Sequence, residues 1–100
     1  MTYHTAYIYH KTDNLLPWLE AREPNPTARQ REYYAEERDI ELVLLIRHDG
    51  KRTLCRIKCP INPLPVRGEF EAPSALAVRS WLNHNGWFYK QTIRADMFNA

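Results

Sequence analysis

The sequence contains little glycine and cysteine, no large excess of either charge and no long apolar run. Of its 100 residues only 3 are Gly and 2 are Cys, and 14 basic against 12 acidic residues leave a net charge of +2. Few glycines together with 44% hydrophobic residues are typical of a folded chain rather than a disordered one. The near balance of charge gives no bulk electrostatic reason to expect binding to nucleic acid or mimicry of DNA. Any basic surface must therefore be local.

No apolar stretch is long enough to cross a membrane, and the N-terminus lacks the basic and then apolar pattern of a secretory leader. Cys55 and Cys59 fall on one predicted strand, roughly 13 Å apart at about 3.3 Å per residue, which is too far for a disulfide. Both thiols fall on an apolar face, as free cysteines do in reducing compartments. We expect a cytoplasmic protein that makes no contact with membranes.

Motifs of catalysis and metal binding are also missing. The sequence has no phosphate-binding glycine loop, metalloprotease helix or nucleophile elbow, and no second Cys or His pair at zinc spacing besides Cys55 and Cys59. No two side chains can be named that would converge on a reacting atom. We therefore expect a non-enzymatic protein with no catalytic residues, no metal ligands and no cofactor.

A strong hairpin signal is present around Asp49 and Gly50. This dipeptide separates two apolar runs, which is typical of a two-residue turn between antiparallel strands. With these two residues as the turn, Arg47 lies directly opposite Arg52 on one face, since side chains alternate between faces. The other face is almost wholly apolar and pairs Ile46 with Thr53, Leu44 with Cys55, Leu42 with Ile57 and Ile40 with Cys59.

Hydrophobic periodicity and helix caps predict the remaining elements. These are a strand over 2–10, a short helix over 15–19, a mostly charged helix over 27–38, a helix between Ser74 and Gly86, and a strand over 87–94. Thr27 and Gln30 have the spacing of a capping box. The order of strands and helices predicts an α+β domain over 1–100 with the ferredoxin-like βαββαβ arrangement, in which helices cover one face of a four-stranded antiparallel sheet. In this prediction 24–38 is a surface helical insertion. The alternative is an antiparallel sheet with one packed helix.

The second face of the predicted hairpin is the first candidate site. Arg47 opposite Arg52 breaks the rule that like charges avoid such positions, and a broken local rule often marks a functional site. Apolar residues lie in the middle of that face and basic ones around them, as in a protein interface. The candidate partner-binding residues are Arg47, Arg52, Arg56, Lys58, Leu45 and Leu54.

Nucleic-acid binding by the same face is the second hypothesis. Tyrosines on one side of the first strand would supply stacking surfaces beside basic residues, the combination that binds single-stranded nucleic acid. The residues for this hypothesis are Tyr3, Tyr7, Tyr9, Arg52, Arg56 and Lys58. An unpaired edge strand also leaves homodimer formation open.

A short chain without catalytic motifs and with a two-faced sheet resembles small phage or mobile-element proteins that inhibit host machinery, including anti-CRISPR proteins. The resemblance is one of general organisation and assigns no residue a role. It implies a non-enzymatic protein that docks on a larger macromolecular assembly, either a protein or a protein–nucleic acid complex, and acts sterically or by competition. The alternative is an RNA or single-stranded DNA binding module.

Overall fold

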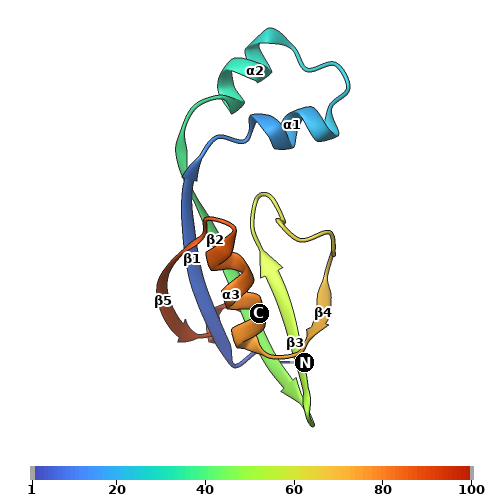
Figure 1. The fold of residues 1–100 in the computed structure, drawn as a ribbon, viewed down its shortest axis with the longest axis vertical. Helices are drawn as coiled ribbons and strands as arrows, with labels where there is room; N and C mark the ends of the chain where they lie inside the picture. Colours follow the sequence, from blue (N-terminus) through green and yellow to red (C-terminus); the bar gives the residue numbers. More distant parts are fainter. Residues whose placement is uncertain (1, 100) are drawn as a thin grey trace.

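A computed structural model describes residues 2–99 as a five-stranded antiparallel sheet with helices, an α+β fold (Figure 1). The strands lie in the order β4-β3-β2-β1-β5. In chain order the elements are β1 (Thr5–Asp13), α1 (Leu16–Arg22), α2 (Ala28–Tyr34), β2 (Arg38–Asp49), β3 (Arg52–Lys58), β4 (Glu69–Ala72), α3 (Ala75–His84), β5 (Phe88–Arg94) and the 3-10 turn η1 (Asp96–Phe98).

Helix α3 covers one face of the sheet. Its first turn is capped by the Ser74 hydroxyl, which accepts a hydrogen bond from the Ala77 amide at 3.1 Å. Val78 and Leu82, one turn apart, are both buried against the central strands. The cluster below them consists of Tyr9, Ile40, Leu42, Leu44, Ile46, Cys55, Ile57, Ala72 and Trp87. This is the main core.

The opposite face is covered near the two ends of the chain. Ala6, Val43 and Leu45 point to this side, where Tyr3 and Phe98 pack against them. The Asn99 side chain binds both backbone polar groups of Tyr3, accepting a hydrogen bond from its amide at 2.9 Å and donating one to its carbonyl at 2.7 Å. Strand β2 is therefore buried on both faces, because it supplies side chains to the main core and to this second cluster.

The ferredoxin-like prediction does not describe this sheet, which has five strands rather than four. The missed strand is β4, whose four residues lie beyond a proline-rich segment and are too few to show a clear alternation. The chain between β1 and β2 also returns to pair antiparallel with β1 instead of crossing the sheet. The alternative prediction, an antiparallel sheet with one packed helix, describes β1–β5 and α3.

The predicted hairpin register was wrong by two residues. Asp49 pairs with Arg52, so the turn residues are Gly50 and Lys51, and Gly50 has a φ of 61° that suits the first central position of a type II′ turn. A shift of two residues leaves every side chain on its predicted face. It does move the partners, and Arg47 lies opposite Leu54 rather than Arg52.

Helices α1 and α2 lie beyond one end of the sheet, at the top of Figure 1. The predicted capping box is confirmed, with the Thr27 hydroxyl accepting from the Gln30 amide and the Gln30 side chain accepting from the Thr27 amide. Leu19 is the buried residue of α1, and α2 has none. Within residues 2–99, no helix combines the length and the apolar character that a membrane crossing needs.

Candidate functional site

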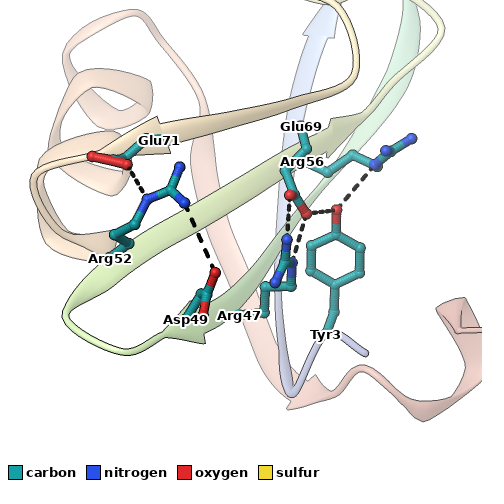
Figure 2. Close-up of polar contacts among 7 residues, drawn as sticks. All are labelled: Tyr3, Arg47, Asp49, Arg52, Arg56, Glu69 and Glu71. Carbon is teal, nitrogen blue, oxygen red and sulfur yellow. Dashed lines mark hydrogen bonds and ion pairs between the residues drawn. The ribbon is translucent and has the colours of Figure 1, made fainter. Parts of the chain in front are cut away.

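The predicted basic face contains a closed polar network (Figure 2). Arg47 is buried, with 7% of its surface exposed, and binds Glu69 through two hydrogen bonds of 2.8 and 2.5 Å. The Tyr3 hydroxyl donates to Glu69 at 2.6 Å and accepts from Arg56 at 3.1 Å. Because β4 places Glu69 beside these cations, much of the predicted positive charge is neutralised within the fold.

The other predicted residues of this face are also engaged. Arg52 binds Glu71 of β4 at 2.6 Å and lies 3.8 Å from Asp49, and the Lys58 ammonium lies 5.9 Å from the centre of the Phe98 ring. Leu45 and Leu54 are buried, so they do not form an exposed apolar centre. The structure places all six predicted partner-binding residues on one face. Most of the charged side chains on that face, however, already have partners within the fold.

The predicted tyrosine row is divided between the two faces. Tyr7 and Tyr9 lie on the α3 side, whereas Tyr3 lies on the side of Arg56. The reason is that Tyr3 precedes β1, which begins at Thr5, so strand alternation does not extend to it. The grouping of Tyr3 with Tyr7 and Tyr9 was therefore wrong, and only Tyr3 lies beside the predicted basic residues.

Glu69 is the electrostatic centre of the network. Hydrogen bonds from Arg47 and then Tyr3 lower the pKa of its carboxyl group to about 2, because both stabilise the carboxylate. The pKa of the Tyr3 hydroxyl is raised, first by burial and then by its hydrogen bond to Glu69. The ion pair with Arg47 therefore contributes to the pKa shift of Glu69, and the hydrogen bond between Glu69 and Tyr3 contributes to both pKa shifts.

A different group of side chains lies between α3 and the edge strand β5. Arg79 of α3 donates a hydrogen bond through Nε to the Tyr9 hydroxyl at 2.9 Å. Its guanidinium carbon lies 4.3 Å from the centre of the Tyr7 ring and 5.0 Å from that of Tyr89. A guanidinium over aromatic faces is held by attraction to the ring quadrupoles. Tyr7, Tyr9 and Tyr89 together form a tyrosine cage for Arg79.

A hollow of about 320 Å³ opens beside this cage, and we call it the Arg79 hollow. Such a volume is at the lower end of the range for ligand sites. Leu76 and Tyr89 on its wall are 71% and 49% exposed. Its lining consists of Tyr9, Leu76, Arg79, Ser80, Asn83 and Tyr89.

Arg79 is half-buried, yet no carboxylate in residues 2–99 forms an ion pair with it. Partial burial acts to lower the pKa of Arg79, but the hydrogen bond to Tyr9 and the surrounding tyrosines raise it overall, so the group stays charged. Only Nε has a hydrogen-bond partner among the described residues, and the terminal nitrogens have none. The side chain is therefore a positioned cation with unused donors.

The sequence carries a signal for this site that the hairpin-centred prediction did not use. Residues 72–95 contain no Asp or Glu but include Arg79, Lys90 and Arg94. Lys90 and Arg94 form exposed ion pairs with Glu41 at 3.4 Å and Asp96 at 3.5 Å, and both carboxylates come from outside this segment. An acid-free segment that forms α3 and β5 indicates an electropositive surface.

In the described part of the chain, no three His, Cys, Asp or Glu side chains gather in a way that could hold a metal ion. Cys55 and Cys59 are free, and burial raises the pKa of the Cys55 thiol to about 11. No protein-family model, curated protein or solved structure matches this chain.

Proposed function

We propose that this chain is a non-enzymatic binding protein that docks on a larger macromolecular assembly through the Arg79 hollow and its rim. The observation that carries the proposal is the half-buried Arg79 guanidinium, which has unused donors and no carboxylate partner in residues 2–99. The terminal nitrogens of Arg79 are not among the buried atoms that lack a partner, so they reach solvent and are accessible to an anion. A partner that places an anion beside Arg79 would form the ion pair that the fold itself does not provide.

The composition of the hollow fits a protein partner. Arginine and tyrosine are the residues most enriched at interface hot spots, and both surround this hollow. Leu76, 71% exposed, adds apolar surface at the rim. The proposal moves the docking surface from the face of Arg47, Arg52 and Arg56 to the face of α3. Inhibition of host machinery by steric blocking, as the resemblance to phage and mobile-element inhibitors implies, is compatible with either surface.

RNA or single-stranded DNA binding is the second candidate function. The acid-free segment 72–95 and the exposed Tyr89 ring favour it, because stacking on an aromatic beside cations is how unpaired bases are held. However, Lys90 and Arg94 already have carboxylate partners, which leaves Arg79 as the unpaired cation of the segment. Tracking a nucleic-acid backbone requires several phosphate contacts. We therefore place this function second.

Photo-crosslinking in the native host cells tests the proposal. Benzoyl-phenylalanine replaces Leu76 on the hollow rim in one variant and Met97 in the control, since the two residues are 71% and 72% exposed and lie on opposite faces of the sheet. We expect a discrete protein adduct at Leu76 that survives nuclease treatment and is absent at Met97. Adduct at Met97 alone, or none at either position, would contradict docking at this surface. A nuclease-sensitive adduct would favour the second function.

A further inference from the structure

We infer that the Arg79 hollow binds an acidic side chain, Asp or Glu, that projects from a protein partner. This inference rests on the proposed function and adds the chemistry of recognition to it. A single carboxylate matches the single unpaired cation of the hollow. The terminal guanidinium nitrogens, which have no partner in residues 2–99, can donate two parallel hydrogen bonds to the two oxygens of a carboxylate.

The tyrosine cage fixes the direction in which those donors point. Tyr9, 2% exposed, accepts from Nε and thereby fixes one edge of the guanidinium plane. Tyr7 and Tyr89 lie against its faces at 4.3 and 5.0 Å. An arginine held in this way loses little conformational entropy on binding, and preorganised side chains are the ones that gain most from a partner.

The size and walls of the hollow select the ligand further. A volume of about 320 Å³ has room for one side chain and its flanks. Leu76 offers apolar contact to a neighbouring partner residue, while Ser80 and Asn83 offer polar groups on the same helix. We therefore expect an acidic side chain with an apolar neighbour.

Two other anions are less well matched. A chain-terminal carboxylate is usually held by a nest of free backbone amides. The residues that line the hollow all belong to the helix α3 and the strands β1 and β5, and no loop residue is among them to form such a nest. A phosphate carries more negative charge than a carboxylate and is best neutralised by several cations, whereas Arg79 is the one cation of the lining.

Titration with small probes tests this inference by NMR. The probe is N-acetyl-Leu-Glu-Leu-amide, the matched neutral probe carries Gln in place of Glu, and phenyl phosphate represents the phosphate ligand. We expect the Glu peptide to shift the Arg79 Nε–Hε signal and to bind at least tenfold more tightly than the Gln peptide. Equal binding of the two peptides, or tighter binding of phenyl phosphate than of the Glu peptide at Arg79, would overturn the inference.

A variant that leaves Arg79 in place makes the test independent of folding defects. Asn83→Glu puts a carboxylate one helical turn from Arg79, where an i,i+4 ion pair would occupy the guanidinium. We expect Asn83→Glu to weaken binding of the Glu peptide at least tenfold. The control Ala77→Glu adds the same charge to an exposed site of α3 outside the hollow and should change affinity less than twofold. Equal effects of the two variants would contradict the inference.

The same pair of variants separates this inference from the proposed function. If a protein is captured at Leu76 and binds Asn83→Glu as tightly as the wild type, docking at this surface stands and the acidic-ligand inference fails. If nothing is captured at Leu76 and the Glu peptide does not bind, both fail.

Discussion

Arg47 is buried and Arg79 is half-buried, but only Arg47 has a carboxylate partner within residues 2–99. Arg47 and Glu69 form a two-bond ion pair that Tyr3 and Arg56 extend. Removing one member of such a pair leaves the other unsatisfied in a poorly solvated place, which is destabilising. Arg79 is instead held by hydroxyl and ring contacts. We read Arg47 as structural and Arg79 as available for binding.

The ion pair of Glu69 should make the free energy of unfolding depend on pH. Its pKa in the folded state is about 2, below the ordinary value of 4.5, so its contribution is fully present above about pH 4.5 and is lost as the pH falls toward 2. Urea unfolding of the wild type and of Glu69→Gln should therefore show a large difference in free energy of unfolding at pH 6 that shrinks toward pH 2.5.

The control for this prediction is Glu71→Gln. Glu71 lies on β4 like Glu69 and pairs with Arg52 of β3, but the Glu71 and Arg52 side chains are more than half exposed, at 54% and 59%, so removal of Glu71 should cost less at pH 6. A difference between Glu69→Gln and the wild type that stays constant from pH 6 to pH 2.5 would contradict this role for Glu69.

At the scale of elements, the β2–β3 turn depends on Gly50. Its φ of 61° lies in the left-handed region, where a side chain is strained even though no atom would lie within 4 Å of an added Cβ. Gly50→Ala should lower the free energy of unfolding by about 1–2 kcal/mol, the usual cost of a left-handed alanine. Gly50→Asn should cost less, because Asn tolerates this region better. Equal unfolding midpoints for Gly50→Ala and the wild type would contradict the assigned turn.

Helices α1 and α2 pack on each other beyond the end of the sheet, and we expect the sheet to fold without them. Asp13 and Arg38 are direct partners in the β1–β2 ladder, so an Asn-Gly turn can replace residues 14–37 and close the hairpin. The replacement removes the buried Leu19 and also Leu15, which packs against the main core, and the smaller loop offsets part of this loss by about 2 kcal/mol of closure entropy. We expect the shortened chain to keep the NMR signals of β3 and α3. Failure of the shortened chain to fold would show that the helices are part of the core.

At the scale of the whole molecule, the faces of β2 and β3 could be predicted from the sequence but the register of their pairing could not. Alternation along 40–59 correctly placed Leu44 and Ile57 in the core and Arg56 outside it. The register failed because Asp49-Gly50 and Gly50-Lys51 both satisfy the turn and leave the faces unchanged. Because β4 was not predicted, its carboxylates were not expected beside the basic face that they neutralise.

The Arg79 hollow could not be predicted from local sequence patterns, and the cause is different. Its side chains come from β1, α3 and β5, and β1 is far in the sequence from the other two elements, so the pairing of β1 with β5 is what brings them together. Periodicity placed residues of α3 on its buried side, but nothing local shows that three tyrosines surround Arg79. The acid-free segment 72–95 was the available local signal.

Affinity measurements on variants test directly whether the protein docks through the face of Arg79 rather than through the face of Arg56. The measurement is the affinity of the captured macromolecule for the wild type, Arg79→Gln and Arg56→Gln, each first shown to be folded by circular dichroism. We expect Arg79→Gln to weaken binding about 30-fold, equivalent to about 2 kcal/mol as for an interface hot spot, and Arg56→Gln to change it less than threefold. A larger loss for Arg56→Gln than for Arg79→Gln would contradict docking at the Arg79 hollow.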